Sequence, residues 1–249
     1  MEWDIICRFF KMNNSTDRII LIDKPLRWTS FDVVRKLKKP LLEEHRLLFP
    51  EAERKLIKRF KVGHAGTLDP LATGLLVICS GKLTKKISEI QDAEKEYTGT
   101  IVLGATTASY DLETEPENHR SIAHVTNEMI LALARKMEGL QDQIPPIHSA
   151  IKVDGRRAYD MARKGVEVEL KSRQIEIKQF EITAISLPEV HFRIVCTKGT
   201  YIRSLAFDFG NKIETGGYLS ALCRTRIGKY ELANAVSPHD FLAQLPEIK

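Results

Sequence analysis

Residues 63–74 have the sequence Gly63-His64-Ala65-Gly66-Thr67-Leu68-Asp69-Pro70-Leu71-Ala72-Thr73-Gly74. This stretch places one acidic residue, Asp69, in a loop that is bounded by glycines and stiffened by Pro70. A proline disfavours helix at the residue before it, and glycines permit turns that other residues resist. The apolar run 75–79 that follows predicts a short buried strand, which would hold the loop. Taken alone, Leu-Asp-Pro also fits an ordinary turn, so a reactive carboxylate at Asp69 needs further support.

Further segments of mixed aromatic, charged and turn-forming residues follow one another along the chain. They are Asp23-Lys24-Pro25 with Trp28-Thr29-Ser30-Phe31-Asp32, Lys95-Glu96-Tyr97, Gln143-Ile144-Pro145-Pro146 with Ser149-Ala150-Ile151-Lys152, Lys198-Gly199-Thr200-Tyr201-Ile202-Arg203, and Gly216-Gly217-Tyr218-Leu219 leading to Leu222. Together with residues 63–74 they resemble, in order, the motifs of the TruB family of tRNA pseudouridine synthases. The resemblance extends over residues 19–230.

The resemblance implies the pseudouridine synthase catalytic fold, which is α+β with a mixed, mainly antiparallel central sheet flanked by helices and loops. The chain itself agrees, because its predicted strands and helices show no regular βαβ repeat. We expect an N-terminal extension over 1–18 and a catalytic domain over 19–249, with a thumb-like insertion near 145–173. We expect no separate C-terminal RNA-binding domain of the PUA type, and a tail from Tyr230 that packs on the catalytic domain.

Local patterns predict the positions of the main elements. Strands are expected at 18–23, 75–79, 95–104 and around 192–196. A helix capped by Thr29 or Ser30 is expected to run through Leu37 until Pro40 interrupts it. Further helices are expected at 41–61, at 124–140 and from Arg203 through Phe209.

Composition sets limits on the class of protein. The chain has 249 residues, 43% of them hydrophobic, which fits a globular protein with a substantial core. The net charge of +5 permits a polyanionic partner, and ten basic residues gather between Arg35 and Lys61, where a phosphate backbone would be attracted. The four cysteines lack metal-binding or redox spacing, so we expect reduced thiols and no metal site. No apolar run is long enough to span a bilayer, and we expect a cytoplasmic protein.

The resemblance assigns the catalytic roles. Asp69 matches the family's essential aspartate, Arg203 its charge partner, and Tyr97 the active-site tyrosine that stacks on the target base. An ionised carboxylate in a dry pocket needs such a partner. The carboxylate of Asp69 can attack C6 of the ring, attack C1′ of the sugar, or act as a base that assists glycal formation, and the sequence leaves these three routes open. The isomerisation has no redox step, so no cofactor is expected.

The same resemblance suggests residues that bind RNA. His64 would occupy the space left by a flipped base or hold a second extruded base. Leu222, or alternatively Leu219, would form the apolar wall opposite Tyr97. Lys24 and the basic residues of the thumb-like insertion would contact the T stem-loop. Between Pro145 and Gly165, the basic residues of this insertion are Lys152, Arg156, Arg157, Arg163 and Lys164. The segment from Arg157 to Arg163 also fits a solvated amphipathic helix.

The expected activity is therefore that of a tRNA pseudouridine(55) synthase, a monomer whose partner is tRNA. The segment 106–111 departs from the family pattern. Many relatives have Thr-Asp-Thr there, whereas in this chain the aspartate, Asp111, is the last residue of the segment. A non-catalytic RNA-binding module would carry the same basic surface, although it would not need Asp69, Tyr97 and Arg203 together. A small-molecule glycosidase is less favoured, because such enzymes usually use two carboxylates.

Overall fold

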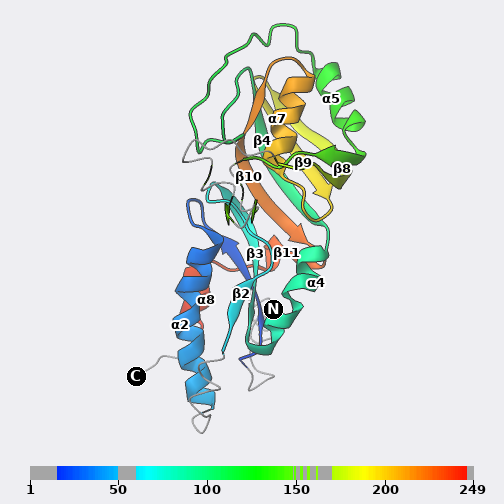
Figure 1. Cartoon of the computed structure of the whole chain (residues 1–249). Helices are drawn as coiled ribbons and strands as arrows, with labels where there is room; N and C mark the ends of the chain where they lie inside the picture. The colour runs from blue at the N-terminus through cyan, green and yellow to red at the C-terminus, as the bar shows by residue number, and fades with distance from the viewer. Residues whose placement is uncertain are drawn as a thin grey trace, which may run out of the picture. The chain divides into compact units, whose positions relative to one another are not determined.

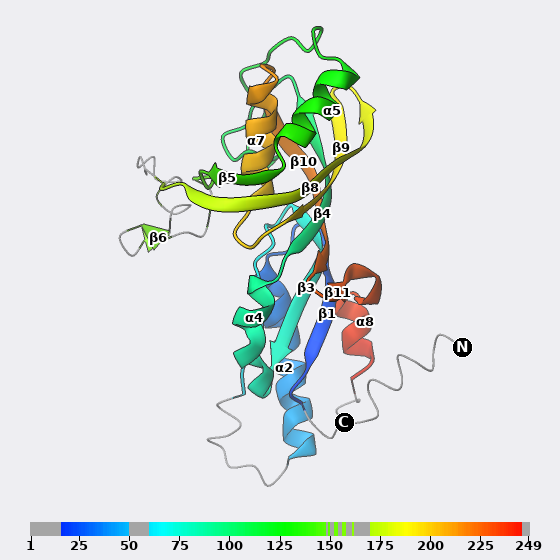
Figure 2. The ribbon, with the colours of Figure 1, turned by 90° about the vertical axis from the view of Figure 1, so that its right-hand side faces the viewer.

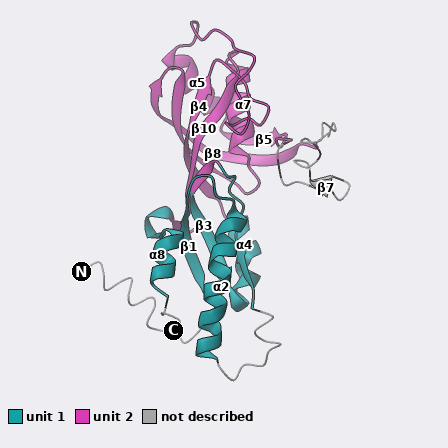
Figure 3. Cartoon of the chain, turned by 90° about the vertical axis from the view of Figure 1, so that its left-hand side faces the viewer, with its two compact units in different colours: residues 1–70, 74–91, 232–249 teal, residues 71–73, 92–231 magenta. Residues whose placement is uncertain are grey.

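The structure, a computed structural model, describes residues 16–49, 60–147, 149, 152–153, 156–157, 161 and 170–245. The chain divides into two compact units, which are coloured separately in Figure 3. Unit 1 comprises residues 1–70, 74–91 and 232–249, and unit 2 comprises residues 71–73 and 92–231.

Unit 1 contains three antiparallel strands in the order β1-β3-β2 (Figure 1). Their bounds are Ile19–Lys24 for β1, Val62–His64 for β2 and Ala72–Ser80 for β3, whose first two residues fall in unit 2. Ile20 lies opposite Ile78 and Ile22 lies opposite Leu76, so the apolar residues of β1 and β3 share one face. The expected strands at both places are confirmed.

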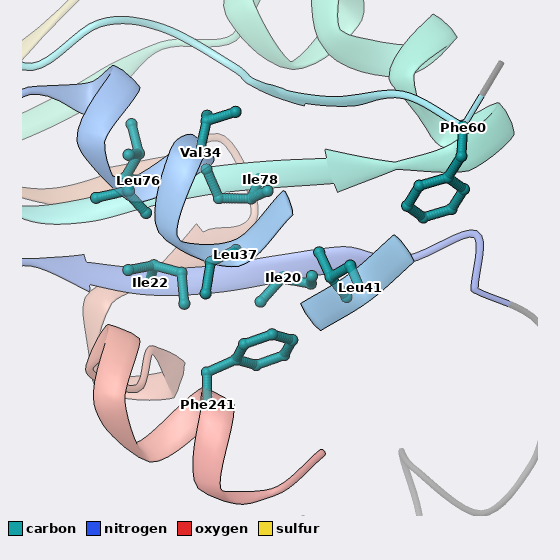
Figure 4. Close-up of a cluster of buried hydrophobic side chains, with 10 residues drawn as sticks. Ile20, Ile22, Val34, Leu37, Leu41, Phe60, Leu76, Ile78 and Phe241 are labelled. Atoms are coloured by element: carbon teal, nitrogen blue, oxygen red, sulfur yellow. The ribbon is translucent and has the colours of Figure 1, made fainter. Parts of the chain in front are cut away.

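The helix α2 (Ser30–Leu48) covers this apolar face. Its buried residues recur at helical spacing, and with Phe241 of α8 (Pro238–Ala243) they close the cluster that Figure 4 shows. The buried residues are Ile20, Ile22, Val33, Val34, Leu37, Leu41, Phe60, Leu76, Ile78 and Phe241. Full burial of one such aliphatic side chain stabilises a protein by about 1.5–3 kcal/mol. The described part of the C-terminal tail therefore packs on the core of unit 1, as expected.

The helix α2 corrects one sequence prediction. Pro40 was expected to end the helix, yet α2 continues through it to Leu48 and includes the first part of the predicted helix 41–61. A proline inside a helix removes one hydrogen bond and costs about 3 kcal/mol. Leu37 and Leu41 flank Pro40 and are fully buried against the strands, which offsets this cost. Residues 50–59 of the predicted second helix lie outside the described residues.

Several shorter segments complete unit 1. They are the 3-10 turns η1 (Gly81–Lys86) and η2 (Leu232–Asn234) and the helix α4 (Ile87–Asp92), whose last residue belongs to unit 2. Of the N-terminal extension, residues 16–18 are described and are held in place: the Ser80 hydroxyl donates to the Thr16 carbonyl at 2.5 Å, and Arg18 pairs with Glu44 at 2.7 Å.

Unit 2 is an antiparallel sheet with the strand order β10-β4-β9-β8-β5, and β11 pairs with the end of β10. The strands are β4 (Lys95–Leu103), β5 (Gly139–Gln143), β8 (Arg173–Ser186), β9 (Glu189–Cys196), β10 (Gly217–Ile227) and β11 (Tyr230–Glu231). The predicted strands in β4 and β9 are thus confirmed.

Two helices, α5 (Asn127–Lys136) and α7 (Ile202–Lys212), lie side by side against this sheet (Figure 2). Phe209 of α7 packs on Phe180 of β8, with ring centroids 5.6 Å apart. The helix α5 is shorter than the predicted 124–140. It starts after Thr126, whose hydroxyl caps it by accepting from Met129 N–H, and it ends at Lys136. The α+β architecture, with a mainly antiparallel sheet and flanking helices, is as predicted.

Within residues 145–173, where a thumb-like insertion is expected, the backbone of β6 (Lys152–Val153) pairs antiparallel with that of β7 (Arg156–Arg157). The side chains of Lys152, Arg156 and Arg157 and most of the remaining insertion lie outside the described residues.

Candidate active site

Asp69 lies in the loop that joins β2 to β3. The two strands pair antiparallel, and Ala65 N–H donates to the Val77 carbonyl at 2.8 Å. The loop therefore connects the two strands of a hydrogen-bonded hairpin. Gly66 has a φ of 98° and Gly74 a φ of 94°, conformations that favour glycine. The run Leu75–Cys79 is fully buried, as predicted. Asp69 itself is half-buried on this rigid support.

The residues on both sides of Asp69 are tied to the segment between β1 and α2. On one side, the Ser30 hydroxyl accepts from Leu68 N–H at 2.8 Å and donates to the Leu68 carbonyl at 3.0 Å. On the other side, the Pro70 carbonyl accepts from Arg27 N–H at 2.7 Å. Arg27 has a φ of 68°, which is uncommon for a residue with a side chain and suits this tight turn.

Lys24, which the sequence predicts to bind RNA, is fully buried at the end of β1. Its ammonium group donates to the Trp28 carbonyl at 2.6 Å, to the Pro25 carbonyl at 3.0 Å and to the Pro70 carbonyl at 3.5 Å. A buried ammonium group needs such partners. The contacts give Lys24 a part in shaping the backbone that supports Asp69, and an RNA contact by Lys24 stays a prediction.

His64 is the last residue of β2 and lies opposite Ile78 of β3. It is half-buried and five residues before Asp69 in the same hairpin. The structure thus places His64 on the strand that carries the loop. Its expected role in RNA binding, to fill the space of the flipped base or to hold a second extruded base, stays a prediction.

In unit 2, Arg203 lies in the first turn of α7 and is buried together with Asp111. Arg203 Nε is 3.6 Å from Asp111 Oδ2, with only 4% and 6% of the two side chains exposed. Arg203 Nη1 also donates to the Ser109 carbonyl at 3.2 Å. A cation near a helix N-terminus is disfavoured by the helix dipole, so the Asp111 carboxylate compensates both the dipole and the burial.

The segment that carries Asp111 is itself anchored. Leu219 N–H of β10 donates to the Tyr110 carbonyl at 3.0 Å, and Glu113 N–H donates to Asp111 Oδ1 at 3.0 Å. The Tyr110 ring stacks on Phe207 of α7, with centroids 4.0 Å apart. Asp111 therefore reaches Arg203 from a fixed loop. The sequence marked this position as a departure from the family, and the structure shows that Arg203 is its partner.

Tyr97 and Leu222 lie on the neighbouring strands β4 and β10. Tyr97 is 8% exposed and has Arg224 of β10 and Ile194 of β9 as cross-strand partners. Leu222 is half-buried opposite Gly99, and its carbonyl accepts from the Thr73 hydroxyl at 3.3 Å. The alternative wall residue, Leu219, is 5% exposed.

The last residue of β5 and the proline-containing loop after it brace the start of α7. The Gln143 side chain exchanges two hydrogen bonds with the backbone of Tyr201, the N-cap of α7. The Ser204 hydroxyl donates to the Ile144 carbonyl at 2.9 Å. These contacts position the helix turn on which Arg203 lies.

The supporting contacts of two of these residues were not predicted from the sequence. Ser30 was considered only as a helix cap, but Thr29 caps α2 and leaves the Ser30 hydroxyl for Leu68. The available signal was the presence of two adjacent hydroxyl residues at the start of a helix, because one of them is enough to cap it. Gln143 was noted as part of a motif, and nothing in the sequence pointed to its partner 58 positions later.

The described residues offer neither a metal site nor a membrane span. They contain no group of three or more His, Cys, Asp or Glu side chains arranged to hold a metal ion. None of their helices combines the length and the apolar character needed to cross a membrane.

Comparison with solved structures shows a fold like that of Cbf5. The structure matches a chain of a Cbf5-Nop10-Gar1 complex with a TM-score of 0.67 and 27% identity over 94% of this chain. It also matches a chain of an H/ACA RNP bound to a substrate RNA containing 2'-deoxyuridine, with a TM-score of 0.63 and 25% identity over 92% of this chain. The chain spans only 55% and 54% of those longer chains.

Comparison of sequences identifies relatives of similar length. The tRNA pseudouridine synthase B of Flavobacterium johnsoniae is 53% identical over 88% of this chain and 92% of its own. That of Phocaeicola vulgatus is 47% identical over 92% of this chain and 94% of its own. The family model described as TruB family pseudouridylate synthase (N terminal domain) matches residues 54–202. This chain therefore belongs to the TruB family of pseudouridylate synthases.

Proposed function

We propose that this chain is a tRNA pseudouridine synthase that converts uridine 55 in the T loop of tRNA to pseudouridine. The observation that carries the proposal is the similarity to a relative named tRNA pseudouridine synthase B. The two chains are 53% identical over a stretch that covers 92% of the relative. The enzyme is an isomerase: the bond from N1 of the base to C1′ of the sugar breaks, C5 bonds to the same C1′, and the proton lost from C5 is balanced by one gained at N1.

Asp69 is the proposed reacting carboxylate. Its support is the rigid hairpin β2–β3 and the backbone hydrogen bonds that hold Leu68 and Pro70. A carboxylate held in this way meets the geometric demand of attack on C6 or C1′, or of proton abstraction toward a glycal. Arg203 is its proposed charge partner in the assembled site, and Asp111 orients the guanidinium group.

The target uridine must leave its stack to react, at a cost of a few kcal/mol. Tyr97 is proposed to stack on the extruded base, with Leu222 as the opposing apolar wall and His64 filling the vacated space. Phosphate contacts are proposed for Lys152, Arg156 and Arg157 of the thumb-like insertion. Lys24 is proposed to support RNA binding through the backbone that its ammonium group holds beside Asp69. We further propose a cytoplasmic monomer that acts without a cofactor, with its catalytic domain over residues 19–249.

Exposed cations on α2 support an RNA partner. The described part of the basic segment 35–61 presents Arg35, Lys36, Lys38, Lys39 and Arg46 on the exposed side of this helix. Arg35 pairs with Asp32 at 2.8 Å and Lys39 lies 3.8 Å from Glu43, so part of this charge is locally balanced. The remaining cations suit a phosphate backbone.

The decisive experiment compares the native chain with Asp69→Asn on an unmodified tRNA transcript, without added cofactor. Pseudouridine is mapped at every position, and tRNA affinity is measured in parallel. We expect one signal in the T loop that Asp69→Asn abolishes, while affinity changes by less than about tenfold. Asp23→Asn is the matched control, because Asp23 is an exposed aspartate of the same unit.

Each alternative has its own outcome. Binding without modification by the native chain would favour a non-catalytic RNA-binding module. Full activity of Asp69→Asn would remove Asp69 from the chemistry. A transcript with cytidine at position 55 tests the position, since modification elsewhere on that transcript would mean a different target uridine.

A further inference from the structure

The Ser30 hydroxyl makes two hydrogen bonds, and both are to one residue, Leu68. The hydroxyl accepts from Leu68 N–H at 2.8 Å and donates to the Leu68 carbonyl at 3.0 Å. Ser30 is 2% exposed and Leu68 is 4% exposed, so water is largely excluded from this contact. Buried peptide groups require partners, and here one hydroxyl supplies both.

The contact bears directly on Asp69, because the Leu68 carbonyl belongs to the peptide group that contains Asp69 N. Holding that carbonyl fixes the plane of the peptide group attached to the Asp69 Cα, from which the side chain projects. On the far side, Pro70 has a fixed φ, and its carbonyl is held by Arg27 N–H at 2.7 Å. The backbone on both sides of Asp69 is thereby constrained.

Ser30 is well placed for this task because its own position is determined by α2. Thr29 forms the capping box with Asp32, in which Asp32 N–H donates to the Thr29 hydroxyl at 3.0 Å and Thr29 N–H donates to Asp32 Oδ2 at 3.0 Å. The helix start is therefore satisfied without the Ser30 hydroxyl. Val33, one turn later, is fully buried and anchors the first turn to the core.

We propose that Ser30 is a positioning residue for the chemical step, acting through the peptide group between Leu68 and Asp69. It touches neither the RNA nor the reacting atoms in this proposal; it sets the direction of the Asp69 carboxylate. The inference rests on the proposed function, since it assumes that Asp69 reacts. Loss of the hydroxyl should slow the chemistry and leave tRNA affinity unchanged.

Ser80 offers a matched control in the same unit. Like Ser30 it is buried, and its hydroxyl links a backbone N–H to a backbone carbonyl of another segment: it accepts from Arg18 N–H at 3.0 Å and donates to the Thr16 carbonyl at 2.5 Å. Ser80 is the last residue of β3, whereas Asp69 lies shortly before Ala72, the first residue of that strand. Ser80→Ala therefore removes comparable contacts at the opposite end of the strand.

The test measures single-turnover rates at saturating tRNA, tRNA dissociation constants and melting temperatures for Ser30→Ala and Ser80→Ala. We expect Ser30→Ala to react roughly 10–100-fold more slowly, with a dissociation constant within about twofold of the native value. Ser80→Ala should lower the melting temperature and keep the native rate. A native rate in Ser30→Ala, or an equal slowing in both variants, would overturn the proposal.

Two further variants keep the result interpretable. Ser30→Thr retains a hydroxyl and should recover most of the rate; a threonine variant that melts like the native chain but reacts as slowly as Ser30→Ala would contradict a role for the hydroxyl. Asp69→Asn is assayed alongside. If it is active, the proposed catalytic aspartate fails; if it is inactive while Ser30→Ala is fully active, only the positioning inference fails.

Discussion

Gln143 and Tyr201 exchange two hydrogen bonds: the Gln143 side-chain amide donates to the Tyr201 carbonyl at 3.0 Å, and Tyr201 N–H donates to Gln143 Oε1 at 2.7 Å. Gln143 is 2% exposed, and Tyr201 starts the helix that carries Arg203. Gln143→Ala should reduce the free energy of unfolding by about 1–3 kcal/mol, because it leaves two backbone groups without this partner. The midpoint of urea unfolding and the rate of pseudouridine formation should both decline.

Gln141→Ala is the control for this prediction. Gln141 lies on the same strand, is half-buried and makes one hydrogen bond, to the Met137 carbonyl at 2.7 Å. Its loss should cost about 1 kcal/mol or less and leave the rate unchanged. Equal effects of the two substitutions on the rate would mean that Gln143 has no special role at the start of α7.

Asp111→Asn should destabilise the chain strongly. The substitution leaves the buried Arg203 guanidinium without the carboxylate 3.6 Å away, and breaking a buried ion pair typically costs about 3–5 kcal/mol. Asp92→Asn is the control: Asp92 lies closer to its partner Lys198, at 2.8 Å, but both side chains are more than half exposed. Exposed pairs contribute about 1 kcal/mol or less, so burial rather than distance should decide the order. Similar unfolding free energies for the two variants would contradict this.

Elements with a strong local pattern were predictable from the sequence. The continuous apolar run Leu75–Cys79 lies fully buried within β3, and Thr29, one of the two expected caps, caps α2. The family resemblance added the α+β architecture. These successes depend on residues that act within a few positions of one another.

Features that depend on tertiary contacts were not predictable. Pro40 was expected to stop α2, and the burial of Leu37 and Leu41 on either side of it reversed that outcome. A lysine at a strand end suggests a solvent-exposed cation, yet Lys24 is buried among carbonyls that only the fold brings together. The partners of Ser30 and Asp111 likewise come from segments that are distant in sequence.

The exposed cations of α2 should contribute to tRNA binding. Replacing Lys36, Lys38 and Arg46 together by glutamine should weaken tRNA binding and reduce its dependence on salt concentration. The slope of the logarithm of the binding constant against the logarithm of salt concentration should become shallower by roughly 0.7–0.9 for each phosphate that is no longer neutralised. The affinity is measured over a series of salt concentrations. Arg135, Lys136 and Lys212, exposed cations of unit 2, form the charge-matched control set. An equal change in both slopes would mean that only net charge matters.

The pKa of Lys95 should be visible in the pH dependence of stability. Burial, and secondarily the nearby Arg224, lower this pKa from 10.5 to about 8; Lys198 acts in the same direction, and Cys196 and Asp92 oppose it. Between about pH 8 and about pH 10.5 the unfolded chain then binds more protons than the folded chain, so Lys95 makes stability rise with pH across that window. We expect the unfolding free energy of the native chain, minus that of Lys95→Met, to increase over the same window. Lys212→Met, which replaces an exposed lysine, should show no such increase. A constant difference for Lys95→Met would mean that Lys95 keeps an ordinary pKa in the folded state.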